Sequence, residues 1–113
     1  MCLALRHVHA RYGIHRDLKP DNIFLTNIRQ VKLGDFGVSS IVEHTNAGTL
    51  TMAGTPLYMS PEMIKGDVKY SFPTDMWSLG CILYEMCSLK KAYVVNDGDT
   101  MKLLSKIVDG PIP

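Results

Sequence analysis

The sequence predicts a mainly α-helical fold with one small β-hairpin, and three observations support this. Apolar residues recur at helical spacing in residues 1–12 and again near the end of the chain. Residues 75–88 are apolar nearly all round, as in a helix that belongs to a core. Two short strand-like runs, residues 23–25 and 31–33, are separated by Asn27, which suits a turn.

The first and last helices have recognisable ends. In residues 1–12 the apolar positions share one helical face, and Gly13 follows as a stop signal. Residues 96–99 predict a turn and a cap for the last helix, which Gly110 closes. The apolar face of that helix consists of Leu103, Leu104, Ile107 and Val108. Earlier in the chain, residues 38–60 are rich in Ser, Thr, Gly and Asn without a period, which predicts a long functional loop.

The helix predicted over residues 75–88 should lie inside the fold. Trp77, Met76 and Met86 are interpreted as core residues rather than as part of a cofactor site. Gly80 costs roughly 1 kcal/mol against alanine in a helix interior, so we expect another segment to pack closely against it.

Composition excludes several classes of protein. The chain has 113 residues, of which 46% are hydrophobic and 20% charged, so it is not of the disordered type. Its formal net charge of +1 gives no electrostatic reason to expect binding to nucleic acid or to an acidic membrane. No apolar run approaches the roughly 20 residues that span a bilayer. Residues 1–15 carry no recognisable targeting signal.

Neither the cysteines nor the histidines are spaced as metal ligands. Cys81 and Cys87 should lie about 9 Å apart along a helix and on different faces, too far for a disulfide. Together with Cys2 they are interpreted as free, buried thiols in a reducing compartment. His7 and His9 should lie on different sides of the first helix and therefore not share a metal ion.

Four short motifs follow one another along the chain. His-Arg-Asp-Leu-Lys-Pro-Asp-Asn occupies residues 15–22, and Asp-Phe-Gly occupies residues 35–37. Gly-Thr-Pro-Leu-Tyr-Met-Ser-Pro-Glu occupies residues 54–62, and Asp-Met-Trp-Ser-Leu-Gly occupies residues 75–80. Together they resemble the eukaryotic protein kinase signature: catalytic loop, magnesium loop, substrate-binding end of the activation segment, and the buried helix behind them. Any one triplet is weak evidence, but the ordered set is strong.

The resemblance implies transfer of the γ-phosphate of ATP to a protein Ser or Thr hydroxyl, with ATP and Mg²⁺ as cofactors. Asp17 would accept or orient the proton of the substrate hydroxyl. Lys19 would contact the transferring phosphate and places the chain with the serine/threonine rather than the tyrosine kinases. Asn22 and Asp35 would bind Mg²⁺ on the phosphates. Phe24 would form the floor of the adenine pocket.

The resemblance also assigns a substrate-binding residue and a regulatory pair. Thr55 would steady Asp17 and Lys19 through its hydroxyl. Arg16 is typical of kinases that are switched on when a phosphate in the activation loop pairs with an arginine. Thr51 is the residue of the loop at which that phosphate is predicted. The alternative is a plain flexible loop without regulation.

Five further residues of the motifs would have structural roles: His15, Phe36, Gly37, Glu62 and Asp75. The ring of His15 would pack against Phe36, and Gly37 would allow a sharp turn of the chain. Glu62 and Asp75 would be anchors of the fold, Asp75 by hydrogen bonding to the backbone of the catalytic loop.

Within the kinases, the chain looks most like the NIMA-related group. The segments that carry this resemblance are Asn-Ile-Phe-Leu-Thr at residues 22–26, Lys-Leu-Gly-Asp-Phe-Gly at residues 32–37, and Leu-Tyr-Glu-Met-Cys-Ser-Leu-Lys at residues 83–90. Ser60 takes the place of the commoner alanine in an Ala-Pro-Glu motif, and the NIMA-related group often has serine there.

The resemblance covers residues 1–113 as one partial kinase domain. It implies part of the large lobe of a fold that is α+β in the full domain, without the nucleotide-gripping small lobe and the last large-lobe helices. We therefore expect this fragment to be inactive alone. One alternative is a noncatalytic truncated product that acts as a scaffold or binding module. Another is a degenerate pseudokinase, against which the intact catalytic and magnesium-binding residues argue.

The expected partners are ATP and a protein substrate with Ser or Thr, and neither nucleic acid nor a membrane is expected. The expected location is intracellular, in the cytoplasm, with cytoskeletal association or the nucleus as alternatives. The identity of the substrate and the oligomeric state are left open by the sequence.

Overall fold

The computed structural model describes residues 1–35, 40–41, 56–66 and 71–113. Its elements, in chain order, are α1 (Cys2–His9), β1 (Gly13–Ile14), the 3-10 helix η1 (Pro20–Asn22), β2 (Ile23–Leu25), β3 (Val31–Leu33), β4 (Ser40–Ile41), α2 (Pro61–Ile64), α3 (Phe72–Ser88) and α4 (Thr100–Asp109). This agrees with the predicted mainly helical fold. Four predicted site residues lie outside the described residues: Phe36, Gly37, Thr51 and Thr55.

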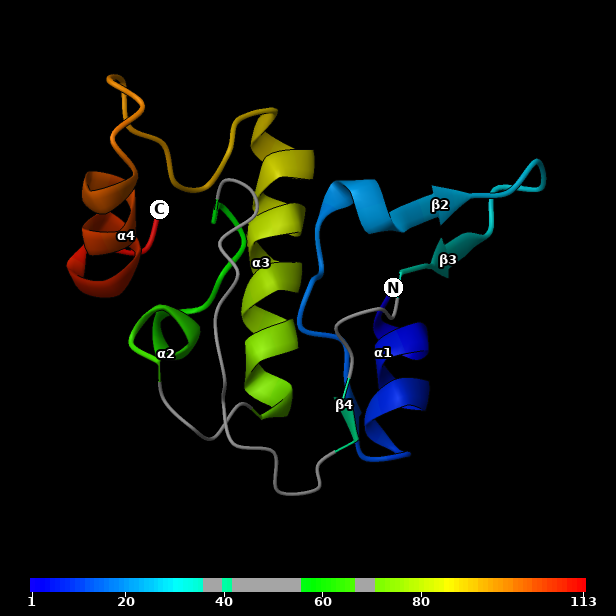
Figure 1. The fold of residues 1–113 in the computed structure, drawn as a ribbon. Helices are drawn as coiled ribbons and strands as arrows, with labels where there is room; N and C mark the ends of the chain where they lie inside the picture. Colours follow the sequence, from blue (N-terminus) through cyan, green and yellow to red (C-terminus); the bar gives the residue numbers. More distant parts are fainter. Residues whose placement is uncertain (36–39, 42–55, 67–70) are drawn as a thin grey trace.

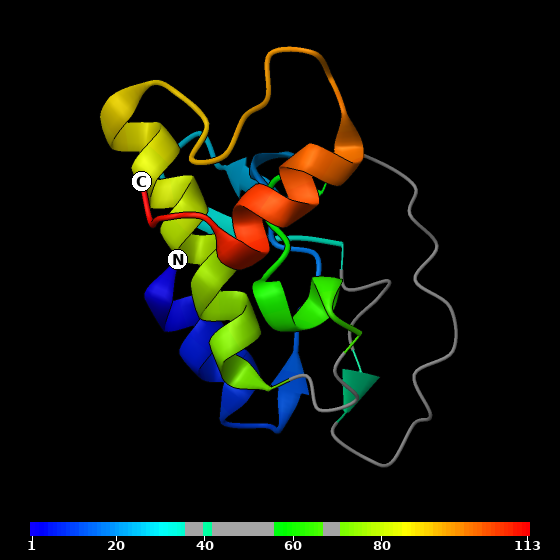
Figure 2. The ribbon, with the colours of Figure 1, turned by 90° about the vertical axis from the view of Figure 1, so that its left-hand side faces the viewer.

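The helix α3 stands at the centre and separates two apolar cores (Figure 1). The first core contains Leu5, Leu18, Leu79 and Ile82, and the second contains Cys81, Tyr93, Leu103 and Ile107. Figure 2 shows α4 in front of α3, with α2 beneath it. Each fully buried aliphatic side chain contributes about 1.5–3 kcal/mol. The first core therefore holds α1 and the loop after it against α3, and the second holds α4.

The first helix ends earlier than the sequence predicts. It spans Cys2–His9 rather than residues 1–12, because Ala10 is its C-cap and Tyr12 adopts a positive φ of 58°. Gly13, expected as the stop, instead begins β1. A Cβ at Gly13 would lie 3.0 Å from Cγ1 of Val8. Glycine is therefore favoured there by the close approach of the strand to the helix.

The predicted hairpin is present. β2 and β3 pair antiparallel, with Ile23 opposite Leu33 and Leu25 opposite Val31. The turn begins at Thr26, whose carbonyl accepts from the Arg29 N–H at 2.9 Å, and Arg29 has a φ of 58°. A positive φ gives the backbone the twist that a tight hairpin turn needs.

A second small sheet was not predicted. β1 pairs antiparallel with β4, so that Gly13 lies opposite Ile41 and Ile14 opposite Ser40. Each strand has two residues, too few for an alternating pattern, and the partners are far apart in the sequence. The sheet places residues 40–41, inside the predicted loop of residues 38–60, beside the end of α1.

The helix α3 is exposed along one face, which corrects the prediction that it is buried all round. Met76, Leu83 and Met86 are 52%, 46% and 65% exposed. Met76 and Met86 are therefore surface residues rather than core residues. The prediction for Gly80 is also wrong, since no described atom lies within 4 Å of a Cβ placed there.

The inward face of α3 is partly polar, with Thr74, Asp75 and Ser78 all buried. Trp77 is half-buried, and its ring stacks on Tyr93 with centroids 5.9 Å apart. The helix ends at Ser88, where Leu89 adopts a left-handed φ of 58°. Hydropathy alone does not identify the buried face of α3, because polar residues are buried there and make hydrogen bonds.

The last helix agrees with its prediction. The Asp99 side chain caps α4 by accepting from the backbone N–H groups of Met101 and Lys102. Leu103 and Ile107 are buried, and Gly110 is the C-cap. The caps and the apolar stripe at helical spacing therefore give the correct bounds.

The cysteines are free, as predicted, but only Cys81 is buried, whereas Cys2 and Cys87 are exposed. The prediction of three buried thiols is therefore wrong for two of them. Among the helices of the described part of the chain, none combines the length and apolar character that a bilayer crossing requires.

Candidate functional site

The loop of residues 15–22 is fixed to α3 by one buried carboxylate. Asp75 is 1% exposed and accepts from the backbone N–H groups of His15 and Arg16, both at 2.9 Å. It also contacts Nε2 of His9 at 2.8 Å. The ring of His9 lies on Phe72, with centroids 4.7 Å apart. Because these partners belong to different segments, α1, the loop and α3 all meet at Asp75.

Three of the predicted site residues contact one another in this loop. Lys19 Nζ donates to Asp17 Oδ2 at 2.7 Å. Asn22 Nδ2 donates to the Asp17 carbonyl at 2.7 Å and to Asp17 Oδ2 at 3.0 Å. Pro20 starts the 3-10 helix η1, whose tight turn brings Asn22 back to Asp17. Asn22 is buried, while Asp17 and Lys19 are half-exposed and open to a ligand.

The charges around Lys19 keep it protonated. The hydrogen bond with Asp17 is the largest influence on the pKa of Lys19 and raises it above its usual value. Burial acts to lower this pKa, but the negative charges of Asp17, Asp21 and Asp35 add to the increase. Lys19 is therefore a cation over the whole physiological pH range.

The backbone beside Asp35 is tied to the same loop. The Gly34 N–H donates to the Asn22 carbonyl at 2.9 Å, and the Gly34 carbonyl accepts from His15 Nε2 at 3.0 Å. His15 is fully buried. These two bonds bring Asp35 to the loop that carries Asp17 and Asn22.

Two of the site residues have unusual backbone angles. Asp35 has a φ of 54° and Arg16 a φ of 69°, values that side-chain-bearing residues rarely adopt. Such conformations gather at functional sites, where the surrounding structure must hold them. Here the bonds of Asp75 to the backbone at Arg16, and those of Gly34 beside Asp35, supply that support.

Phe24 of β2 offers an open aromatic face. Its ring is 55% exposed and passes close to Gly34, where a Cβ would lie 2.5 Å from Phe24 Cε2. The absence of a side chain at Gly34 therefore lets this ring lie where it does. Sequence reasoning did not single out Gly34, although a glycine beside a strand is a known sign of close approach.

A second polar cluster, which the sequence did not predict, surrounds Tyr58. Its hydroxyl donates to Glu85 Oε2 at 2.6 Å and accepts from Lys91 Nζ at 3.3 Å. Its carbonyl accepts from Ser78 Oγ at 2.7 Å. Burial and the Glu85 carboxylate raise the pKa of Tyr58 well above its usual value, so the phenol stays neutral. The cluster fixes the segment before α2 to α3, but its members are too far apart in the sequence to form a motif.

Glu62 connects α2 with the start of α3. Its carboxylate accepts from Thr74 Oγ1 at 2.9 Å. Burial acts to raise the pKa of Glu62, but hydrogen bonds to its carboxylate, among them the one from the Thr74 hydroxyl, outweigh burial and hold this pKa below its usual value. Glu62 is therefore an ionised link between two helices.

The residues of the loop fit the magnesium and nucleotide that the sequence predicts. Asn22 uses its nitrogen toward Asp17, so its side-chain oxygen is left to act as a ligand. Together with the Asp35 carboxylate it supplies hard oxygen donors, which Mg²⁺ takes along with phosphate oxygens. Within the described ranges, no cluster of three or more His, Cys, Asp and Glu side chains could hold a metal ion.

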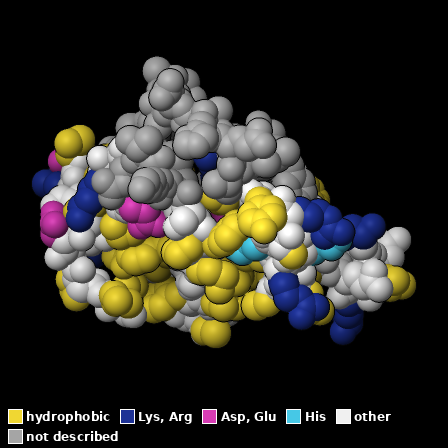
Figure 3. Space-filling model, turned by 90° about the horizontal axis from the view of Figure 1, so that it is seen from below, with side chains coloured by type: hydrophobic (Ala, Val, Ile, Leu, Met, Phe, Trp, Pro, Cys, Tyr) yellow, Lys and Arg dark blue, Asp and Glu magenta, His cyan; other side chains and the backbone are white. Residues whose placement is uncertain are grey.

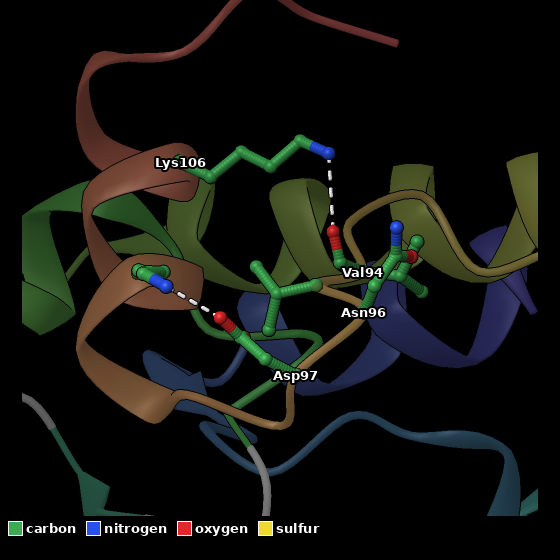
Figure 4. Close-up of a pocket in the computed structure, with 6 residues that line it drawn as sticks. Val94, Asn96, Asp97 and Lys106 are labelled. Atoms are coloured by element: carbon green, nitrogen blue, oxygen red, sulfur yellow. Dashed lines mark hydrogen bonds and ion pairs between the residues drawn. The ribbon is translucent and has the colours of Figure 1, made fainter.

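Two hollows on the surface of the described residues lie elsewhere. One of about 390 Å³ is lined by Val94, Val95, Asn96, Asp97, Lys102 and Lys106 (Figure 4). Lys106 Nζ donates to the Val94 carbonyl at 3.1 Å, and Lys102 pairs with Asp97, so both cations are engaged within the chain. Another, of about 350 Å³, lies between α1 and β3. Neither lining includes a site residue predicted from the sequence.

Comparison with known proteins gives consistent matches. The sequence matches the family model of the protein kinase domain over residues 1–109. It is 45% identical over 113 residues to serine/threonine-protein kinase Nek1 of Mus musculus. The aligned region covers 100% of this chain and 9% of that protein. It is 44% identical over 112 residues to serine/threonine-protein kinase Nek3 of Mus musculus (99% of this chain, 21% of that protein). It is 47% identical over 115 residues to serine/threonine-protein kinase Nek2 of Homo sapiens (97% and 25%). The chain thus spans a quarter or less of the length of these curated relatives.

Proposed function

Because the chain belongs to the protein kinase domain family and is similar to the NIMA-related kinases, we propose that the protein containing it phosphorylates Ser or Thr of protein substrates with ATP. The predicted family is confirmed by these comparisons, and the activity is our proposal. The observation that supports it best is the bonded set of Asp17, Lys19 and Asn22, in a loop that Asp75 fixes to the central helix. In this proposal the chain is part of the large lobe of the kinase domain.

Asp17 is the proposed acceptor of the substrate proton. Within the described part of the chain, its side-chain contacts to Lys19 and Asn22 both use Oδ2. Oδ1 is therefore the oxygen that would face the substrate hydroxyl. Lys19, held cationic beside it, would contact the transferring phosphate and offset its charge.

Asn22 and Asp35 are the proposed magnesium ligands, and Phe24 the proposed adenine contact. Mg²⁺ would neutralise charge on the phosphates when it is bound with ATP. The bonds of Gly34 to Asn22 and His15 support this by holding Asp35 beside the loop. The exposed ring of Phe24 supports an apolar contact with a planar base.

The proposal extends to residues outside the described ranges. Thr55 would steady Asp17 and Lys19, and a phosphate on Thr51 would pair with Arg16. Phe36 would pack on His15, and Gly37 would permit the turn after it. The pairing of Arg16 with a phosphate is supported by its backbone, because the hydrogen bond from the Arg16 N–H to Asp75 holds this residue in place.

The test replaces Asp17 with asparagine in the full-length protein. Asp17→Asn keeps the shape of the side chain but removes the proton acceptor, so kcat/KM should fall by about 10²–10⁴-fold. Phosphate incorporation from labelled ATP into casein measures it. The matched control is Asp21→Asn, an exposed carboxylate in the same loop, which should keep most of the activity. Equal activity of the Asp17→Asn and wild-type proteins would refute the proposed mechanism.

A further inference from the structure

A shallow hollow between α1 and β3 has an apolar floor. It encloses about 350 Å³, a volume within the usual range of ligand sites. Its lining consists of Ala4, His7, Val8, Val31, Lys32 and Leu33. Four of these six side chains are aliphatic, and His7 and Lys32 supply the polar edge. The hollow can therefore take apolar groups from a ligand whose polar groups face the rim.

The surface around this hollow is cationic. Residues 1–16 and 22–34, which include α1 and the hairpin, contain no Asp or Glu, and the exposed carboxylates of Asp21 and Asp35 adjoin these ranges. Their exposed Lys and Arg side chains are Arg6, Arg11, Arg29 and Lys32. Figure 3 shows Lys, Arg and His side chains gathered on the side of the molecule where α1 and the hairpin lie. The chain as a whole is nearly neutral at +1, so this is a local concentration of positive charge.

The rim residue His7 is held in place by Arg11, which lies outside the lining. Arg11 Nη1 donates to His7 Nδ1 at 3.0 Å and to the His7 carbonyl at 3.1 Å. Since Nδ1 accepts this bond, the proton of the ring is on Nε2, which is a donor. The rim therefore offers the His7 Nε2–H group as a donor that is held in place, and such donors suit carboxylate groups.

The hairpin adds exposed apolar surface and a strand edge. Leu25 and Ile28 are 73% and 74% exposed, and Val31 is cross-strand from Leu25. In the described part of the chain β3 pairs only with β2, and an extended peptide that docks here would add along its other edge. Alternate side chains of such a peptide would face the apolar floor and the cationic rim.

We propose that this hollow docks an extended acidic segment of a partner protein, with aliphatic side chains on the floor and carboxylates on the rim. The match of charge is the argument for this occupant. Docking here needs neither ATP nor Asp17, so the inference goes beyond the proposed function and can hold without it.

The experiment measures binding of a fluorescein-labelled ten-residue peptide of alternating Glu and Leu to the full-length protein by fluorescence anisotropy. Lys32→Glu should weaken binding about tenfold, which corresponds to roughly 1.4 kcal/mol. Val31→Thr keeps the shape but lowers apolarity and should weaken binding about threefold. The matched control Lys65→Glu makes the same charge change at the exposed end of α2 and should have no effect. Asp17→Asn should bind normally, which separates docking from catalysis.

Three results would overturn the proposal. One is that the Glu-Leu peptide does not bind, or that a peptide with Lys in place of Glu binds equally well. Another is equal affinity of the wild-type and Lys32→Glu proteins for the peptide. If Lys32→Glu binds less tightly because its fold is lost, its Tm will be lowered, and the affinity of Val31→Thr then decides. A third is that vesicles of phosphatidylcholine and phosphatidylserine bind in a Lys32-dependent way while the peptide does not, which would assign the surface to a membrane.

Discussion

Burial sets the chemistry of single side chains in this chain, and the three cysteines illustrate this. Cys81 lies in the second core beside Tyr93, and burial raises the pKa of its thiol to about 11. Only about one such thiol in a thousand is ionised at pH 8, and the thiolate is the reactive form. Cys2 and Cys87 are exposed, so reagents reach them without unfolding of the protein.

We therefore expect iodoacetamide at pH 8 to alkylate Cys2 and Cys87 of the native full-length protein while Cys81 remains unmodified. Peptide mass spectrometry after quenching measures the extent at each site. In urea all three should react alike, which serves as the control. Modification of native Cys81 as fast as Cys87 would show that the core around it opens readily.

At the scale of elements, the contact of Glu62 with Thr74 joins α2 to α3. Thr74 is buried and donates to the carboxylate of Glu62, whose pKa is lower than its usual 4.5 in the folded protein. A carboxylate with a lowered folded pKa adds stability above its unfolded pKa and loses it as the pH falls through the folded pKa. This contribution is thus complete at neutral pH, begins to decrease near pH 4.5 and is lost once the pH falls below the lowered pKa of the folded protein.

Thr74→Val keeps the shape and removes the donor, so it should destabilise the protein by about 1 kcal/mol at pH 7. The Tm of the variant should lie below that of the wild type at pH 7, and the gap should narrow as the pH falls toward 3. Thermal unfolding across this pH range measures both. The control is Thr100→Val at the exposed start of α4. A gap that stays constant with pH would show that Thr74 acts through packing alone.

Local signals in the sequence were sufficient for the hairpin and for α4. The hairpin has a turn residue, Asn27, between two strand-like runs, and α4 has the cap Asp99 and an apolar face at helical spacing. Local signals failed where contacts between distant segments determine the structure. The pairing of β1 with β4 and the faces of α3 depend on partners far along the chain, so Gly80 and Met86 were placed wrongly.

The candidate site divides in the same way. Asp17, Lys19 and Asn22 share one short motif, and the structure places them in contact. The cluster around Tyr58 and the close approach of Phe24 to Gly34 depend on tertiary contacts, which a motif does not encode. Roles that require a bound nucleotide or the residues outside the described ranges stay predictions.

At the scale of the whole molecule, Asp75 connects the parts. One buried carboxylate takes hydrogen bonds from the loop at His15 and Arg16 and contacts His9 of α1, while it belongs to the central helix. Asparagine at this position would present an N–H group to one of these donors. It would also leave buried groups without a partner, at a cost of about 3 kcal/mol.

Asp75→Asn should therefore lower the Tm of the full kinase domain by roughly 6–12 °C, the shift expected for this energy in a domain of that size. It should also reduce phosphate transfer, since the loop that carries Asp17 loses its anchor. Differential scanning calorimetry and a kinase assay measure the two effects. Asp109→Asn, an exposed residue at the end of α4, is the control. An unchanged Tm would mean that the loop is held by its own internal bonds.

The residues with positive φ carry a consequence for how the chain tolerates change. Tyr12, Arg29 and Leu89 adopt this conformation on the surface, at the ends of α1 and α3 and in the hairpin turn. Glycine or asparagine would lower the energetic cost of the positive φ there, so related sequences should tolerate substitutions at these positions. Arg16 and Asp35 adopt it where the side chain itself is proposed to act. A saturation library should therefore be enriched for glycine at the first three positions and depleted of every substitution at the last two.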